Sequence, residues 1–322
     1  MDIHDAKAKR VVILGTGGTI AGTAADPGDN VGYQAAQLGV AQLVAAVPAL
    51  AAVALECEQV AQLDSKDMDF ATWKLLAQRV AAQLAREDVA GLVITHGTDT
   101  LEETAYFLQR VLAPKKPVVL TAAMRPATAL QTDGPQNLLD AVAVAQDAQA
   151  TGVLLVFAGV IHAAEQVRKA HSYRVDAFVS SDGARLGLVE EGLLRWVAGL
   201  GPARPGLGLE ILAQAVEDWP RVEILFNHVA ADGRLVRALL AQAGGDRPAG
   251  LVVAGTGNGS LSQKLEAALR EAQAQGVRVL RSTRCDAGPV TASGEALPSA
   301  GALSPVKARV ELILQLLSEA RA

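Results

Sequence analysis

Short aliphatic runs recur along this chain, and segments with helical periodicity separate them. The runs are typical of strands buried on both faces, because nearly every residue in them is apolar. They lie at residues 10–16, 53–60, 91–97, 117–124, 152–159, 222–227, 250–257 and 276–283. The helical segments lie at residues 72–86, 101–112, 137–149, 233–243 and 261–275. This alternation predicts an α/β protein with a largely parallel sheet.

A change in composition predicts two domains. Residues 199–220 are rich in Gly and Pro and lack strong periodicity, which is typical of a linker. We expect a larger N-terminal α/β domain at 1–198, with a mixed or parallel sheet flanked by helices. A smaller C-terminal parallel α/β domain is expected at 221–322. Aromatic residues make up only 3% of the chain, so small aliphatic side chains must fill both cores.

Charge and hydropathy exclude several classes of partner. The net charge is −5 and no long basic run occurs, which argues against nucleic acid and anionic membranes. No apolar run reaches the roughly 20 residues that span a bilayer, and no signal peptide is visible at the N-terminus. Cys57 and Cys285 lack the spacing of metal ligands, so we interpret them as reduced packing thiols. A cytoplasmic location is expected.

The stretch LGTGGTIAGT, residues 14–23, follows the first strand. A dinucleotide fingerprint would require glycine at position 20, which is Ile20, and no P-loop lysine follows. Thr16 lies between Gly15 and Gly17, where its hydroxyl is approachable and neighbouring amides can donate. A nucleophile with an oxyanion hole needs these two properties. A plain tight turn is the alternative interpretation.

The stretch THGTDTLEET, residues 95–104, follows the third strand. Thr98 and Asp99 stand at its carboxyl end, where α/β sheets bind their ligands. Alone, Asp99 could simply begin the following helix. Thr100 with Glu103 fits a capping box for a helix at 101–112. We interpret His96 as a packed structural histidine.

Two further charged positions bear on the chemistry. Arg125 followed by Asp133 predicts an internal ion pair that shapes the loop between them. A threonine without a Ser-His-Asp triad needs another base, and Lys169 in VRKAHS is a candidate. A single lysine is more often exposed to solvent, so this assignment needs further support.

Taken together, these stretches resemble the bacterial L-asparaginase family. TGGTIAG and ITHGTDTLEETAYFL are similar to its two signature motifs. AAMRPATA, DGPQNL, GNGS and SPVKARV resemble further segments of the family in the same order. The similarity extends from Val11 to about Leu316.

The resemblance implies catalytic roles at matching positions. Thr16 would be the primary nucleophile, and Tyr33 would polarise it. Thr98, Asp99 and Lys169 would form a second catalytic set. The segment 22–34, which holds Tyr33, would be a lid that closes over substrate.

Binding roles are implied in the same way. Ser65 and Asp99 would bind the α-carboxylate and α-amino groups, and the Ala123 carbonyl would contact the side-chain amide. Asn258 and Glu295 would complete the site, with Glu295 supplied by a neighbouring subunit. The resemblance implies a homotetramer of two intimate dimers, without metal or cofactor.

The implied reaction is hydrolysis of L-asparagine to L-aspartate and ammonia. A threonine oxygen would attack the side-chain amide, and backbone N–H groups would hold the oxyanion. Water would then cleave a β-aspartyl ester, with the second set acting as acid and base. The sequence leaves open which threonine attacks first.

Lys66 departs from the family pattern. Family members usually carry Gln or Glu after the serine, where the side chain contacts the substrate ammonium. A lysine there would repel that cation, unless it turns away or pairs with an acid such as Glu295. We predict weaker binding of the α-amino group than is usual in the family.

Other functions remain as alternatives. A dual glutaminase-asparaginase is one, since a one-carbon difference between substrates is hard to reject. The amide-hydrolysing subunit of a tRNA-dependent amidotransferase is disfavoured by the acidic charge. A non-catalytic amino-acid sensor is disfavoured by the presence of Thr16, Thr98 and Lys169. Zinc and serine hydrolases are excluded because H-E-x-x-H and G-x-S-x-G are missing.

Overall fold

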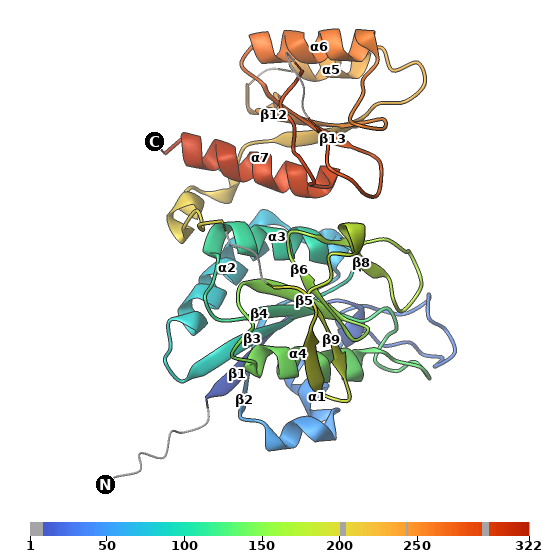
Figure 1. The fold of residues 1–322 in the computed structure, drawn as a ribbon, viewed down its shortest axis with the longest axis vertical. Helices are drawn as coiled ribbons and strands as arrows, with labels where there is room; N and C mark the ends of the chain where they lie inside the picture. The colour runs from blue at the N-terminus through green and yellow to red at the C-terminus, as the bar shows by residue number, and fades with distance from the viewer. Residues whose placement is uncertain (1–8, 200–203, 243, 292–295, 322) are drawn as a thin grey trace. The chain divides into compact units, whose positions relative to one another are not determined.

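The computed structural model describes residues 9–199, 204–242, 244–291 and 296–321. The chain forms two compact units, Met1–Leu209 and Glu210–Ala322 (Figure 1). Each unit has its own sheet and helices, so the expected two-domain α/β fold is confirmed. The division falls inside the predicted linker, of which residues 200–203 lie outside the described part. The domain boundaries at 198 and 221 stay predictions.

An eight-stranded sheet forms the centre of the first unit. Its strands in spatial order are β10 (Leu193–Trp196), β9 (Gly187–Glu190), β6 (Val160–Ala163), β5 (Val153–Phe157), β4 (Val118–Thr121), β3 (Val89–Thr95), β1 (Arg10–Gly17) and β2 (Leu55–Leu63). The block from β5 to β2 is parallel, whereas β6, β9 and β10 pair antiparallel. The carboxyl ends of β1, β3 and β4 therefore lie at one edge of the sheet.

Helices cover both faces of this sheet (Figure 1). On one face lie α1 (Val40–Ala45) and α4 (Gly134–Gln146), and on the other α2 (Phe70–Leu84) and α3 (Leu101–Leu112). Short 3₁₀ helices are η1 (Thr19–Ala21), η2 (Pro48–Ala52), η3 (Ser65–Asp67) and η4 (Ser181–Gly183). A separate hairpin of β7 (Val167–Lys169) and β8 (Phe178–Ser180) contacts α3 and β6.

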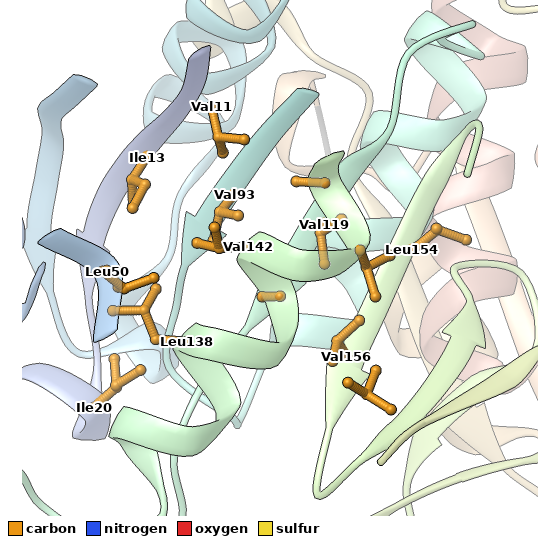
Figure 2. Close-up of a cluster of buried hydrophobic side chains, with 14 of the residues drawn as sticks. Val11, Ile13, Ile20, Leu50, Val93, Val119, Leu138, Val142, Leu154 and Val156 are labelled. Atoms are coloured by element: carbon orange, nitrogen blue, oxygen red, sulfur yellow. The ribbon is translucent and has the colours of Figure 1, made fainter. Parts of the chain in front are cut away.

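The central strands β1, β3, β4 and β5 are apolar because both of their faces are covered. Val11 and Ile13 of β1 belong to a buried cluster that includes Leu138 of α4 (Figure 2). Val12 and Leu14 are equally buried at the intervening positions. Successive side chains of a strand point to opposite faces, so neither face of β1 can carry a polar residue here. Burial of each such side chain contributes roughly 1.5–3 kcal/mol.

The antiparallel strands are the part of the sheet that the sequence did not predict. Two-residue turns join β5 to β6 and β9 to β10. Ala158 and Gly159 have φ of 48° and 74° in the first turn, and Glu191 and Gly192 have 50° and 74° in the second. Hairpin turns of this kind favour Asn or Asp at the first of the two positions. Because Ala158 and Glu191 occupy these positions, the sequence gives no turn signal. The strands β6, β9 and β10 have only four residues each and show little periodicity.

The second unit is a small parallel α/β domain. Its three-stranded sheet contains β11 (Val222–Phe226), β12 (Gly250–Gly255) and β13 (Arg278–Thr283). Its helices are α5 (Arg234–Leu240), α6 (Gln263–Ala274) and α7 (Pro305–Glu319), with 3₁₀ turns η5 (Leu209–Leu212), η6 (Val216–Asp218) and η7 (Gly244–Asp246). Helices α5 and α6 pack together on one face, and α7 packs on the other. In the part of the chain that the structure describes, no helix has the length and apolarity needed to cross a membrane.

Candidate active site

The last residues of β1 bring a buried threonine to the edge of the sheet. Thr16 is only 1% exposed, and its Oγ1 donates to the main-chain oxygen of Thr95 at 2.9 Å. Because the hydroxyl proton is used in this bond, the oxygen keeps lone pairs for other chemistry. Thr19 shares a 2.7 Å hydrogen bond with the Tyr33 hydroxyl. The structure thus places Tyr33 against Thr19, a residue to which the sequence motifs assign no role.

Glycines let the loops at this edge come into backbone contact. Gly18 has φ 82° and ψ −174°, a region essentially restricted to glycine. A Cβ on Gly18 would lie 2.3 Å from the Gly97 nitrogen, and a Cβ on Gly97 would lie 2.5 Å from the Ser65 Oγ. The loops after β1 and β3 and the start of η3 therefore meet at distances that exclude side chains.

Lys169 joins two residues of the loop after β3. Its Nζ lies 2.8 Å from the Thr98 Oγ1 and 2.7 Å from the Asp99 Oδ1. Thr98 is 6% exposed, and the Lys169 side chain is 18% exposed. Lys169 ends β7, some 70 residues further along the chain. The structure thus brings together the three residues predicted to form the second catalytic set.

Ser65 fixes the position of this loop. Its Oγ accepts from the main-chain N–H of Asp99 at 3.1 Å, and its main-chain oxygen accepts from the Thr100 hydroxyl at 2.8 Å. Thr100 makes no side-chain cap to the helix α3, so the predicted capping box is wrong. The helix itself spans the predicted residues. The threonine hydroxyl instead donates to the main-chain oxygen of Ser65 in a neighbouring segment.

Lys66 pairs with a neighbour in sequence. Its Nζ lies 2.7 Å from the Asp64 Oδ2, and the Lys66 side chain is 63% exposed. The hydrogen bond and charge of Asp64 raise the pKa of Lys66, with smaller contributions from Asp67 and Asp99. Lys66 is therefore a cation near the Asp99 carboxylate. Glu295, the other partner considered for it, lies outside the described residues.

The loop after β4 is held from within by one carboxylate. Asp133 accepts from the main-chain N–H groups of Met124 and Arg125, each at 2.9 Å. Arg125 forms no salt bridge with it in the described residues, so the predicted ion pair is wrong. Ala123 is fully buried at the start of this loop. Asn137 of α4 adds a bond to the Ala122 oxygen at 3.0 Å.

A buried histidine supports the β3 loop from below. His96 is 0% exposed, and its Nδ1 lies 2.7 Å from the Gly97 oxygen. Nδ1 must therefore donate, which leaves Nε2 to accept from the Thr104 hydroxyl at 3.0 Å. The Thr104 oxygen accepts in turn from Trp73 Nε1 at 2.9 Å. Burial lowers the pKa of His96 to about 4, so the ring is neutral at ordinary pH.

The segment 22–34 is attached at its base and open at its tip. Thr23 and Gln34 form an antiparallel bridge, and the Ala24 N–H donates to the Thr128 Oγ1 at 2.8 Å. The tip is tightened by Asp29, whose side chain accepts two main-chain N–H groups. Val31 at the tip is 76% exposed. A fixed base with an exposed tip is compatible with the predicted lid.

The remaining predicted residues belong to the second unit. Asn258 donates to the Thr291 oxygen at 3.2 Å and accepts from the Thr291 N–H at 2.8 Å. Both groups of its amide are thus engaged by one residue of the same unit. Glu295 falls outside the residues that the structure describes. For the described part, no group of three or more His, Cys, Asp or Glu side chains is arranged to hold a metal ion.

These features define a class of protein. A buried threonine and a Thr-Lys-Asp grouping at the carboxyl edge of an α/β sheet are the parts of a hydroxyl-dependent acyl-transfer site. Models of two protein families match the chain: "Asparaginase, N-terminal" over residues 10–199 and "Glutaminase/Asparaginase C-terminal domain" over residues 221–321. The chain belongs to the bacterial-type asparaginase family.

Individual relatives resemble the chain over nearly its whole length. A glutaminase-asparaginase of Pseudomonas fluorescens biotype A is 40% identical over 320 residues, covering 96% of this chain and 87% of the relative. L-asparaginase 2 of Bacillus subtilis strain 168 is 36% identical, covering 94% and 81%. The crystal structure of a probable cytoplasmic L-asparaginase from Campylobacter jejuni superposes with a TM-score of 0.88 at 38% identity, covering 96% and 95%.

Proposed function

We propose that the protein hydrolyses the side-chain amide of L-asparagine to L-aspartate and ammonia through a threonine nucleophile. The observation that carries this proposal is the contact of Lys169 Nζ with both the Thr98 hydroxyl and the Asp99 carboxylate. This contact stands at the sheet edge near Thr16, the penultimate residue of β1. The names of the relatives support asparagine as the substrate.

In the first half of the reaction, the Thr16 oxygen attacks the amide carbon and its proton passes to the second catalytic set. The oxyanion needs main-chain donors. In the described residues the Thr98 N–H has no acceptor, whereas the Gly18 N–H donates to Leu63 and the Asp99 N–H to Ser65. Thr98 and its neighbour Gly97, whose N–H also has no acceptor in the described residues, are therefore the candidate donors. The amide nitrogen takes a proton and leaves as ammonia, which gives a β-aspartyl ester of Thr16.

In the second half, water attacks the ester carbonyl and the second set accepts its proton. The Thr98 oxygen takes the proton of water, the Thr98 proton passes to Lys169, and a Lys169 proton passes to the Asp99 carboxylate 2.7 Å away. The Thr16 oxygen leaves with a proton, and L-aspartate is released. General acid and base catalysis of this kind typically contributes about 10²–10⁴-fold.

Substrate binding uses the surrounding loops. Ser65 and Asp99 take the α-carboxylate and α-amino groups, and the Ala123 carbonyl takes the side-chain amide. Lys66 weakens the amino-group contact through its positive charge. Closure of the 22–34 segment brings Tyr33 toward Thr16 and excludes water.

The assembly and location are further parts of this proposal. A homotetramer of two intimate dimers, in which Asn258 and Glu295 complete the site, follows from the family resemblance. Light scattering on the purified protein tests the tetramer, and the monomer mass would contradict it. Cell fractionation tests the cytoplasmic location.

The decisive experiment is the initial rate of ammonia release from L-asparagine and L-glutamine near neutral pH. Thr16→Ala is the matched control. Release from asparagine that disappears in Thr16→Ala is the expected result. No release from either amide would overturn the proposal and favour the amino-acid sensor.

A dual glutaminase-asparaginase is the second candidate. The Pseudomonas fluorescens relative, described as a glutaminase-asparaginase, favours it. Apolar contacts alone discriminate one methylene by only about 10–200-fold. Comparable kcat/KM values for the two amides would establish the dual activity, and a ratio beyond this range would reject it.

A further inference from the structure

One arginine links two loops at the edge of the first unit's sheet. Arg125 lies in the loop that contains Ala123, and Tyr173 lies in the loop that follows Lys169. The Arg125 guanidinium donates to the Tyr173 main-chain oxygen at 2.9 Å. Its Cζ also lies 4.2 Å from the centroid of the Tyr173 ring. One side chain therefore ties together two loops that are far apart in the sequence.

Both ends of this tie are firmly held. The Asp133 carboxylate accepts from the main-chain N–H of Arg125 at 2.9 Å. In the other loop, His171 Nδ1 accepts from the main-chain N–H of Tyr173 at 3.0 Å. Because each loop is braced internally, a shift of Tyr173 is transmitted along the short connection to Lys169.

The contacts of Arg125 indicate positioning rather than charge balance. It has no salt bridge within the described residues, and its partners are the carbonyl oxygens of Met124 and Tyr173 and an aromatic face. A planar guanidinium can stack and donate at the same time, which a lysine ammonium cannot do. The planar shape of the Arg125 guanidinium therefore matters more for this contact than its charge.

We propose that Arg125 is a positioning residue that, with Tyr173, sets the place of the Lys169 ammonium relative to the Ala123 carbonyl. This inference rests on the proposed amidohydrolase function. Lys169 bonds two partners at 2.7–2.8 Å, so a small displacement breaks its geometry. A misplacement of 1 Å can cost about 100-fold in rate. Since other contacts remain, loss of this tie predicts a fall in kcat of about tenfold.

The experiment measures kcat and KM for L-asparagine, together with thermal unfolding, in wild type and five variants. Arg125→Met removes the whole tie, and Tyr173→Ala removes the ring while keeping the main-chain oxygen. Tyr173→Phe keeps the ring and is the conservative rescue. The double variant Arg125→Met/Tyr173→Ala tests whether the two residues act through the same contact. Arg174→Met is the matched control, because Arg174 pairs with Asp176 on the same loop.

We expect Arg125→Met to lower kcat about tenfold with little change in KM or melting temperature. Tyr173→Ala should lower kcat by a smaller factor, and Tyr173→Phe and Arg174→Met should keep the wild-type kcat. The kcat of the double variant Arg125→Met/Tyr173→Ala should be no lower than that of Arg125→Met. An unchanged kcat in Arg125→Met, losses that multiply in the double variant, or a kcat loss that follows a fall in melting temperature would overturn the inference. A wild type that releases no ammonia overturns the proposed function and this inference together. An active wild type with unaffected variants overturns this inference alone.

Discussion

The end of β1 and the loop after β3 each carry a buried threonine at the same edge of one sheet, yet the surroundings of the two threonines differ. The Thr16 hydroxyl donates to the neutral main-chain oxygen of Thr95. The Thr98 hydroxyl instead accepts from the Lys169 ammonium, beside the Asp99 carboxylate. In the proposed mechanism, the first arrangement keeps lone pairs available for attack, and the second acts as a proton relay. The same residue type thus acquires different chemistry from the groups beside it.

The largest effect should come from removing either threonine. Thr16→Ala should abolish ammonia release because it removes the nucleophile. Thr98→Ala should lower kcat/KM by about 10³-fold, near the middle of the range for general acid–base groups. Acid quenching followed by intact-protein mass spectrometry distinguishes their roles. Thr98→Ala should still form an aspartyl ester, since the nucleophile is intact, and Thr16→Ala should form none.

The opposite result would exchange the two roles. An adduct on Thr16→Ala that peptide mapping assigns to Thr98 would make Thr98 the nucleophile. Thermal unfolding of both variants is the control, because a folded protein is needed to interpret either rate.

The contact between the two loops can be broken at Gly18. Alanine there would adopt a backbone conformation that costs about 1–3 kcal/mol, and its Cβ would overlap the Gly97 main chain. We expect Gly18→Ala to lower the free energy of unfolding by about 3 kcal/mol or more and to abolish activity. Gly39→Ala is the control, since Gly39 has φ −74° and no atom within 3.4 Å of the added Cβ. Full stability in Gly18→Ala would show that the close approach is not required.

The long periodic elements of the fold could be predicted from the sequence, and the contacts of the site only partly. Helix α3 has the predicted bounds because its apolar face recurs over twelve residues. The periodic segment of helix α4 begins only at residue 137, but Pro135 suits a helix start, and the helix begins at Gly134 with this proline in its first turn. The antiparallel strands could not be predicted, because their turns carry Ala158 and Glu191, rather than Asn, Asp or Gly, at positions with positive φ.

Motifs and resemblance named Thr16 and the set of Thr98, Asp99 and Lys169, but not the hydrogen-bond partner of Thr16 or that of Thr100. Thr16 bonds a main-chain oxygen, and every residue has one, so no residue type in the sequence marks Thr95 as the acceptor. The Thr100 hydroxyl could either cap helix α3 or donate to the main-chain oxygen of Ser65. Only the tertiary placement of η3 decides between them.

A substitution at His96 should destabilise the loop after β3 without removing a residue of the proposed catalytic set. Burial lowers the pKa of His96 to about 4, whereas an unfolded histidine titrates near 6.5. The stability from the neutral ring is therefore complete above pH 6.5 and is lost as the pH falls toward 4, since only the unfolded chain binds a proton in that window. The loss amounts to about 3 kcal/mol.

His96→Gln removes this titration. Chemical denaturation at pH 7 and pH 4.5 should show the variant less stable than wild type at pH 7, with a difference that narrows at pH 4.5. If the stability difference between the variant and wild type is the same at pH 7 and pH 4.5, His96 is protonated at pH 4.5 in the folded protein as it is in the unfolded chain. Activity at pH 7 should fall less than in Thr98→Ala, because His96 touches the main chain of the loop and not Thr98 or Lys169.

The smallest effect concerns Lys66, which adds a charge beside the β3 loop without bonding to it. Its neighbour Ser65 holds the Asp99 N–H, while Lys66 itself pairs with Asp64 and stays largely exposed. Solvent and salt weaken a charge in that position, so Lys66→Gln should lower KM for L-asparagine only about threefold and leave kcat unchanged. The same substitution at exposed Lys115, in the turn before β4, is the matched control and should change neither constant. Added salt should lower the wild-type KM toward that of Lys66→Gln, because screening removes the repulsion that the substitution removes. If KM stays the same in Lys66→Gln, the lysine does not act on the substrate ammonium, and the Asp64 pair alone explains its position.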